Sequence, residues 1–292
     1  MYRAIHTPHQ GSVLYSRYMV LGRLAVGSGS TIFRVEDVRN SNAVRAMKMA
    51  RLTDGDQHSF DLEIMALTKC KGSSNFPQLV DHFVNKSYRV IVMTLEGEMI
   101  RDVLGRNRVK CFSNQNTLRI ARQLLNALHF LHSNGFLHRT VNNENVLIKK
   151  TGLHLVVTLC DLNHVTPTES RQKLEHPGYY ASLHAALGEN FEERDDMVSA
   201  MYLVGELSGF IIFDFVVNDL IEAKKKFHYN PCSFFPDHKK WIGRLVQLID
   251  RMGEGKKIDM DSLDRQYQKA IEGVSPYRPI VFKTVKNVVY VE

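Results

Sequence analysis

The segment "FLHRTVNNENVLI" holds the residues whose types and spacing point most directly to chemistry. It matches the pattern H-R-D-x-x-x-x-N, in which His138 and Arg139 are present and Asn145 closes the pattern. Thr140 stands at the position of the aspartate. An aspartate there can accept the proton of a substrate hydroxyl during phosphoryl transfer, whereas a threonine at neutral pH cannot. The segment therefore predicts a phosphoryl-transfer loop that has lost its catalytic base.

Two other residues of this loop bear on the same reaction. Asn142 occupies the position that usually holds a lysine, whose charge steadies the phosphoryl group during transfer. Glu144 is the nearest carboxylate that could replace the missing base, although a solvent-facing loop residue is the favoured interpretation. Asn142, like Thr140, therefore weakens the case for efficient catalysis.

A metal site is predicted further along the chain. Asp161 opens the segment Asp161-Leu162-Asn163, which follows an apolar strand and fits the position of a D-F-G motif. Together with Asn145, Asp161 would supply oxygen ligands for Mg²⁺. Asn163 replaces the glycine of the motif, and because asparagine tolerates positive φ we expect the turn to persist.

A glycine-rich turn near the N-terminus is a candidate phosphate-binding loop. In "LAVGSGSTIFRV" the pattern G-x-G-x-x-G-x-V falls on four residues: Ala25, Gly27, Ser30 and Ile32. Glycines at these positions let backbone amides approach phosphates. Because only the second glycine is present, an ordinary hairpin is the alternative interpretation.

Lys48 and Glu63 are a candidate ion pair for the same nucleotide. Lys48 lies on a short predicted strand, and Glu63 lies 15 residues later on the next predicted helix. A strand lysine that contacts phosphates and a helix glutamate that pairs with it have this order. Each residue taken alone is typical of a solvated surface, so the prediction depends on its place among the other motifs.

The elements that must position these residues fall into two parts. Alternating apolar and polar residues over 18–38 predict a strand, a turn and a second strand. Further strands are predicted over 43–49, 79–83 and 89–94, and a helical period of apolar residues predicts a helix over 59–69. Later segments are mainly helical, over 116–132, 239–252 and 262–272, with short strands at 146–149 and 155–159. We expect an α+β, bilobal fold with Gly97 at the hinge. The predicted parts are an extension 1–17, a small β-rich lobe 18–95, a larger helical lobe 96–275 and a tail 276–292.

The totals set the class of protein. The chain has 292 residues, 44% of them hydrophobic, and a formal net charge of +7, which favours anionic partners. Its four cysteines have no paired spacing, which fits a reducing, intracellular location in the cytoplasm or nucleus. The apolar stretch 197–217 contains Glu206 and Asp214 and predicts a buried helix rather than a membrane span.

With these motifs in order, the chain resembles a protein kinase of the casein kinase 1 and tau-tubulin kinase branch. "YRVIVMTLEGEMIRDVL" is similar to that branch's hinge segment, "YNVMVMELLGPSLEDL". "YYASLHAALGENFEERDDMVSAMY" resembles its "RYASINTHLGxxxSRRDDLESLGY" without a gap. The resemblance covers roughly residues 18–272 and implies the bilobal protein-kinase fold.

The resemblance also implies roles for individual residues. Met93 would be the gatekeeper of the nucleotide pocket, Leu95 would lie in the hinge, and Leu147 would form the floor beneath the adenine, while Ala46 would also line this pocket. Asp196 would be the buried helix aspartate that ties down the catalytic loop, with His138 and Arg139 as structural residues beside it. Glu193 departs from the family, because it replaces an arginine that helps to bind acidic substrates.

Three functions stay open from the sequence. The first is a pseudokinase that binds or scaffolds a protein partner and still accommodates ATP and Mg²⁺. The second is a weakly active serine/threonine kinase with a protein substrate. The third is an anionic-surface or nucleic-acid binder that uses three basic clusters, Arg106–Lys110, Lys224–Lys226 and His238–Lys240. No specific nucleic-acid motif accompanies these clusters, so solvated faces are favoured, and the oligomeric state is left open.

Overall fold

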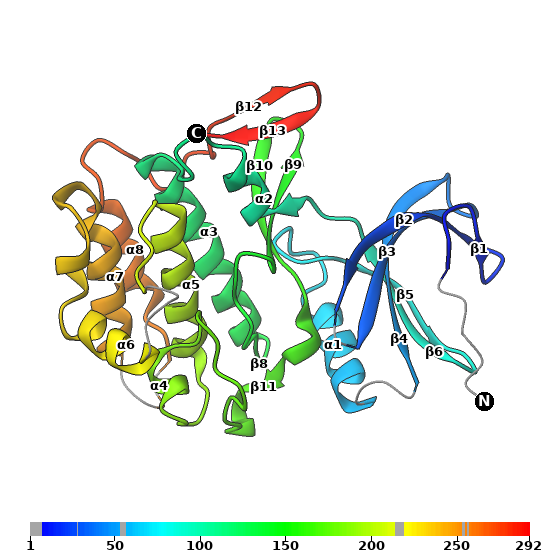
Figure 1. Cartoon of the computed structure of the whole chain (residues 1–292), viewed down its shortest axis with the longest axis horizontal. Coiled ribbons are helices and arrows are strands. Elements are labelled where there is room, and N and C mark those ends of the chain that lie inside the picture. The colour runs from blue at the N-terminus through cyan, green and yellow to red at the C-terminus, as the bar shows by residue number, and fades with distance from the viewer. Residues whose placement is uncertain (1–7, 28, 53–56, 214–218, 253–254, 256) are drawn as a thin grey trace. The chain divides into compact units, whose positions relative to one another are not determined.

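The computed structural model describes residues 8–27, 29–52, 57–213, 219–252, 255 and 257–292. The chain folds as two compact units, each with its own core. The first comprises Met1–Ser73 and Pro77–Glu96, and the second comprises Ser74–Phe76 and Gly97–Glu292 (Figure 1). The short segment 74–76 therefore belongs to the second unit, although the chain on both sides of it belongs to the first.

In the part of the first unit that the structure describes, an antiparallel six-stranded sheet is accompanied by one helix. Its strand order is β1-β2-β3-β4-β6-β5. The strands are β1 (Val13–Leu14), β2 (Tyr18–Val26), β3 (Ser30–Asp37), β4 (Ala43–Arg51), β5 (Leu79–Val84) and β6 (Tyr88–Thr94), and the helix is α1 (Gln57–Lys69). The segment 1–17, expected to be an extension, contributes the edge strand β1, while residues 1–7 lie outside the described part.

Alternation along the strands gives this sheet two different faces. Side chains of one set of alternate positions form a buried apolar cluster: Tyr18, Val20, Phe33, Val35, Met47, Met49, Val90 and Val92. The opposite face carries Ile32 and Lys48, which are paired directly across β3 and β4. Because side chains alternate between faces along a strand, one face holds the sheet together and the other is left for function.

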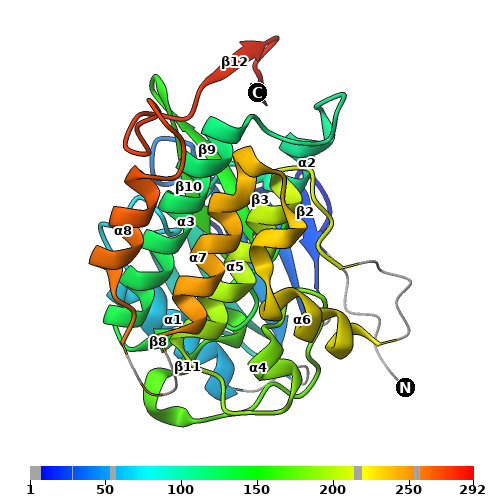
Figure 2. The same ribbon diagram turned by 90° about the vertical axis from the view of Figure 1, so that its left-hand side faces the viewer.

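Packed helices form the second unit. They are α2 (Ile100–Gly105), α3 (Asn114–Ser133), α4 (Leu183–Ala186), α5 (Glu193–Leu207), α6 (Leu220–Tyr229), α7 (Lys240–Asp250) and α8 (Met260–Gln268). Helix α5 packs between α3 and α7, and α8 packs against α7 and α3 (Figure 2). Almost every residue of α5 is buried, so this helix is the centre of the unit.

Three small sheets complete the second unit. β9 (Val146–Thr151) pairs with β10 (His154–Leu159) on one side and with β7 (Glu98–Met99) on the other. β8 (Phe136–Leu137) pairs with β11 (Thr166–Pro167).

Gly97, the expected hinge, starts this unit where the backbone passes close to β9. An added Cβ there would lie 1.8 Å from the carbonyl oxygen of Ile148, so glycine is required by close approach.

One predicted segment differs from the structure. The apolar stretch 197–217 is a buried helix only as far as Leu207, because Gly209 adopts φ +89 and turns the chain, and Ile211 beyond it is 65% exposed; residues 214–217 lie outside the described part. The tail 276–292 forms a hairpin of β12 (Phe282–Val285) and β13 (Val288–Val291). Among the described residues, no helix is long and apolar enough to cross a membrane.

Candidate active site

Asp196 fixes the loop that follows β8. Its carboxylate is fully buried at the first turns of α5 and accepts hydrogen bonds from the backbone N–H groups of His138 and Arg139, both at 2.7 Å. Arg139 has a positive φ of 70, a backbone conformation that costs energy in a residue with a Cβ. The two charge-assisted hydrogen bonds offset this cost and hold the loop in one conformation.

His138 connects this loop to the strand β10. Its Nε2 lies 3.0 Å from the carbonyl oxygen of Cys160, which can only accept, so Nε2 carries the proton. Its Nδ1 therefore has a lone pair and accepts from the backbone N–H of Thr140 at 3.3 Å. Complete burial lowers the pKa of His138, which keeps the ring neutral near pH 7. His138 is thus a bracing residue in the second unit.

Thr140 occupies the position of the catalytic base and makes only local contacts in the described part of the chain. Its hydroxyl lies 3.3 Å from Nδ1 of His138. Its carbonyl oxygen accepts a hydrogen bond from the side-chain Nδ2 of Asn145 at 2.9 Å. A hydroxyl in this place can donate or accept a hydrogen bond but cannot hold a proton taken from a substrate at neutral pH.

Asn142 has a structural use in place of a lysine's charge. Its side-chain Oδ1 accepts from the backbone N–H groups of Glu144 at 2.8 Å and Asn145 at 2.9 Å. This arrangement resembles a helix N-cap, in which a short polar side chain satisfies backbone donors. The amide stabilises the turn, but it brings no positive charge to a phosphoryl group.

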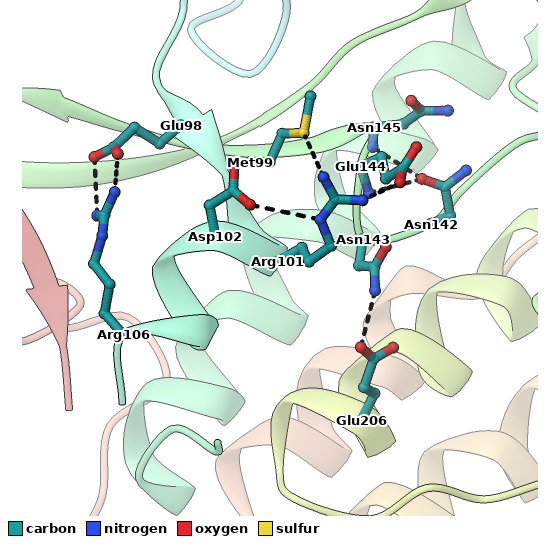
Figure 3. Close-up of polar contacts among 10 residues, drawn as sticks. All are labelled: Glu98, Met99, Arg101, Asp102, Arg106, Asn142, Asn143, Glu144, Asn145 and Glu206. Atoms are coloured by element: carbon teal, nitrogen blue, oxygen red, sulfur yellow. Dashed lines mark hydrogen bonds and ion pairs between the residues drawn. The ribbon is translucent and has the colours of Figure 1, made fainter. Parts of the chain in front are cut away.

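Glu144, the candidate alternative base, is held by a cation. Its carboxylate forms an ion pair with Arg101 of α2, and Asp102 and Met99 also contact the same guanidinium (Figure 3). The Glu144 side chain is 57% exposed, so the ion pair contributes little stability. The guanidinium occupies a carboxylate oxygen of Glu144 that would otherwise accept a substrate proton.

A second anchor of the loop was missed from the sequence. Asn143 donates from Nδ2 to Glu206 of α5 at 2.9 Å (Figure 3). The hydroxyl of Tyr180 donates to the other carboxylate oxygen of Glu206. Burial and the hydrogen bond to Glu206 raise the pKa of Tyr180. The sequence signal was available, because Glu206 is a carboxylate within an otherwise apolar helix, where a partner is required.

The candidate metal ligands lie at neighbouring ends of β9 and β10. The backbone N–H of Cys160 donates to the carbonyl oxygen of Asn145 at 2.9 Å, and Asp161 is the residue that follows Cys160. Asp161 has φ 59 and precedes a 3₁₀ turn, Leu162–His164. The expected positive φ at Asn163 is therefore wrong: Asp161 adopts it, and Asn163 lies inside the turn. A carboxylate and an amide oxygen fit Mg²⁺, which completes its shell with water and phosphates.

The first unit carries a buried ion pair. Nζ of Lys48 lies 2.9 and 2.7 Å from the two carboxylate oxygens of Glu63 on α1, with the side chains 7% and 3% exposed. Other candidate nucleotide-binding residues share the sheet face of Lys48, because residues paired directly across neighbouring strands point to the same face. Ile32 pairs with Lys48, and Ala25 pairs with Ile32. Ala46, two residues before Lys48 on the same strand, pairs with Met93. The sequence predicted the pairing of Lys48 and Glu63, and the contact forms.

The remaining candidate residues take simple places. Gly27 and Ser30 close the β2–β3 turn, where the backbone N–H of Gly27 donates to the carbonyl oxygen of Ser30 at 2.8 Å, and Ser28 between them lies outside the described part. Leu95 follows β6 and is half-buried. Leu147 of β9 alternates with the fully buried Val146 and Ile148, so it faces the other side of that hairpin.

Comparison with known proteins agrees with these motifs. The model of the protein kinase domain family matches residues 15–185. The chain belongs to the protein kinase family. A probable casein kinase I homolog of Encephalitozoon cuniculi is 23% identical over 195 residues, covering 64% of this chain and 61% of that protein. A putative casein kinase I of Caenorhabditis elegans is 30% identical over 138 residues, covering 47% and 40%.

The kinase fold is confirmed at the level of structure. The chain is similar to the structure of vaccinia related kinase 3, with a TM-score of 0.76 and 19% identity over 94% of this chain and 95% of that one. The chain is thus a kinase-domain protein related to casein kinase I-like enzymes, with a β-sheet unit and a helical unit. The matched segment spans less than two thirds of the length of each casein kinase I relative.

Proposed function

We propose that this protein is a pseudokinase, which acts by binding a protein partner and does not transfer phosphate efficiently. The contact of Thr140 with His138 carries this proposal. At the position of the base, the loop presents a hydroxyl, which does not hold a proton at neutral pH. The Nδ1 lone pair of His138 is already used by the backbone N–H and the hydroxyl of Thr140, and burial lowers the pKa of His138, so this ring is a poor substitute for the base. Losing a general base costs about 10²–10⁴ in rate.

The amide of Asn142 supports the same proposal. A lysine at this position would stabilise charge that develops on the transferring phosphoryl group. In this chain the side chain is neutral and is used to cap two backbone N–H groups. Because the missing base and the missing charge act on the same transition state, their costs combine, and little turnover is expected.

Nucleotide binding is a separate part of the proposal. Asn145 and Asp161 provide the oxygen donors that would hold Mg²⁺, and the Lys48–Glu63 pair provides an ammonium that is already oriented for phosphate. When bound, Mg²⁺ would neutralise charge on the phosphates of ATP. The protein would therefore bind ATP and Mg²⁺ without using them efficiently, so that nucleotide serves to stabilise the fold that a partner recognises.

The deciding experiment combines binding and turnover on the same preparation. The melting temperature is measured with and without ATP and Mg²⁺, and release of labelled phosphate is followed in parallel. We expect a Mg²⁺-dependent rise in the melting temperature that is lost in Lys48→Ala and Asp161→Ala, with phosphate release no faster than in Lys48→Ala. Phosphate release clearly above the Lys48→Ala control would overturn the proposal.

A weakly active serine/threonine kinase is the second candidate function. The observation in its favour is the intact Lys48–Glu63 pair together with Asn145 and Asp161, since phosphoryl transfer depends mostly on positioning and electrostatics. The ion pair of Glu144 with Arg101 counts against an alternative base in the loop. Autophosphorylation that requires both Asp161 and Glu144 would favour this candidate.

A further inference from the structure

A pocket of about 310 Å³ lies in the second unit, away from the loop of Thr140. It is bordered by α3, by the start of β10 and by the segment 276–279 that leads into the C-terminal hairpin (Figure 2 shows the last two beside each other). Its polar lining comes mainly from Arg122, Gln123 and Asn126 of α3 and from Arg278. None of the described residues that line it is acidic.

Arg119 lies three residues before Arg122 on α3, and of the two only Arg122 lines the pocket. Arg119 is only 6% exposed, its Nε has no hydrogen-bond partner among the described residues, and its Nη1 reaches Asn116 only at 3.4 Å. Burial and the nearby charge of Arg278 lower the pKa of Arg119. A buried cation with so few partners is costly, and an anion nearby would offset that cost.

The guanidinium of Arg122 also has hydrogen-bonding capacity that the described part of the chain does not satisfy. Its Cζ lies over the ring of Tyr277, 4.3 Å from the ring centre. Its Nε has no hydrogen-bond partner in the described part, since the nearest carboxylate oxygen, of Asp264, is 3.7 Å away. Asp264 is itself engaged by the hydroxyl of Tyr277. Two arginines, Arg122 and Arg278, line the pocket and none of its described lining residues is acidic, so the site has excess positive charge.

The neutral polar groups of the pocket are already oriented. Gln123 accepts from the backbone N–H of Val157 at 2.9 Å through its Oε1, so its NH₂ group is the end that can serve a ligand. His154 and Ser74 add exposed polar groups at the border. Donors therefore outnumber acceptors around the pocket, which is the chemistry that a phosphoryl group or a carboxylate requires.

We propose that this pocket binds the phosphoryl group of a phosphorylated peptide. Arginines recognise phosphate through paired N–H donors, and of the two that line the pocket, Arg122 retains an Nε without a hydrogen-bond partner in the described part. The flanks are apolar, formed by Leu155, Val156, Pro276 and Pro279. A recessed cationic pocket with apolar flanks suits a peptide better than nucleic acid, which uses an extended basic groove with exposed stacking aromatics.

Fluorescence anisotropy with a labelled Gly-phosphoserine-Gly peptide tests this site in the full chain. Its serine form is the control for charge, and its glutamate form separates phosphate from carboxylate. Arg278 is exposed, so Arg278→Gln should fold normally. We expect that variant to weaken phosphopeptide binding by about tenfold, with Arg278→Lys retaining more affinity. Arg244→Gln, which changes an exposed arginine of α7 outside the pocket lining, should bind like the natural chain.

The nucleotide-binding residues must be excluded as the source of any signal. Binding that persists in Lys48→Ala but falls in Arg278→Gln assigns the phosphopeptide to this pocket. The opposite pattern, or an equal loss in Arg244→Gln, would overturn the proposal, and so would no binding at millimolar peptide. Equal affinity for the glutamate form would overturn the choice of phosphate. Binding to phosphatidylinositol 4-phosphate vesicles or to poly-uridine without binding to the phosphopeptide would overturn the choice of ligand class.

Discussion

The hydroxyl of Thr140 lies 3.3 Å from Nδ1 of His138, a ring nitrogen that carries a lone pair because Nε2 donates to the carbonyl oxygen of Cys160. The threonine therefore donates to a residue that braces the loop. Its presence does not disturb the backbone there, since Asp196 still holds both neighbouring N–H groups. The loop has kept its shape while its chemistry has changed.

Restoring the two lost groups should restore phosphoryl transfer. The double variant Thr140→Asp/Asn142→Lys returns a base and a cation to a loop whose anchors are intact, so we expect ATP turnover to rise by about 10²-fold or more. Asn142→Lys also removes the cap on Glu144 and Asn145, which should lower stability by about 1 kcal/mol. Turnover is measured as Mg²⁺-dependent release of labelled phosphate.

The matched control is Thr140→Asn/Asn142→Lys, which has nearly the same shape at residue 140 but no carboxylate. It should gain much less turnover than the Thr140→Asp double variant, because it restores the charge at residue 142 but not the base. If the Thr140→Asp double variant is as inactive as this control while still binding ATP, a further defect outside residues 138–145 must block the reaction.

Asp196 should be a large contributor to stability. Replacing it by alanine removes three buried hydrogen bonds, to His138 N, Arg139 N and His132 Nε2. We expect the free energy of unfolding to fall by about 3 kcal/mol or more, measured by urea denaturation. Asp237→Ala, at an aspartate whose side chain is 93% exposed, should leave the unfolding midpoint nearly unchanged. Similar midpoints for the two variants would contradict the anchoring role.

The Lys48–Glu63 pair should be needed for nucleotide binding and should also support the first unit. Lys48→Met takes the ammonium from a glutamate that is 3% exposed, and we expect a loss of about 3 kcal/mol in stability. Replacing both residues, by Lys48→Met and Glu63→Leu, should recover much of that stability but none of the nucleotide-dependent rise in melting temperature. A rise that survives in the double variant would show that ATP binds without this pair.

Lys224 of α6 gives the protein a pH-dependent stability above neutrality. Its ammonium is fully buried and donates to the carbonyl oxygens of Tyr179, at 2.8 Å, and Ala181. Burial lowers its pKa from 10.5 to about 7. Tyr202, whose ring the ammonium faces, stays neutral because burial raises its pKa well above the usual value.

The sign of this effect follows from proton counting. Between about pH 7 and 10.5 the unfolded chain keeps the Lys224 proton and the folded chain releases it, so the free energy of unfolding rises with pH, by at most about 1.4 kcal/mol per unit. Below pH 7 both states hold the proton and this contribution is constant. Urea titrations across this range should show the slope reduced in Lys224→Met but unchanged in Lys226→Met, at an exposed neighbour. Equal slopes in all three proteins would contradict it.

Much of the fold could be predicted from residue patterns. The helix predicted over 116–132 is α3 (Asn114–Ser133), and the strand predicted over 43–49 is β4 (Ala43–Arg51), because both have a clear apolar period. The helix predicted over 197–217 was too long, since the apolar run continues past a glycine whose backbone turns the chain. Composition gave no sign of that turn, which depends on one φ angle.

The sequence by itself determined the family and the residue types at the motif positions, because these depend only on which residue stands at a fixed spacing within a motif, as Thr140 and Asn145 do. Only the tertiary structure decided how the side chains near the loop are used. The contacts of Glu144 with Arg101 and of Asn143 with Glu206 join residues 43 and 63 positions apart. The arginine-lined pocket likewise forms only when the C-terminal segment packs against α3, since a charge has its effect through neighbours that the chain brings close by folding.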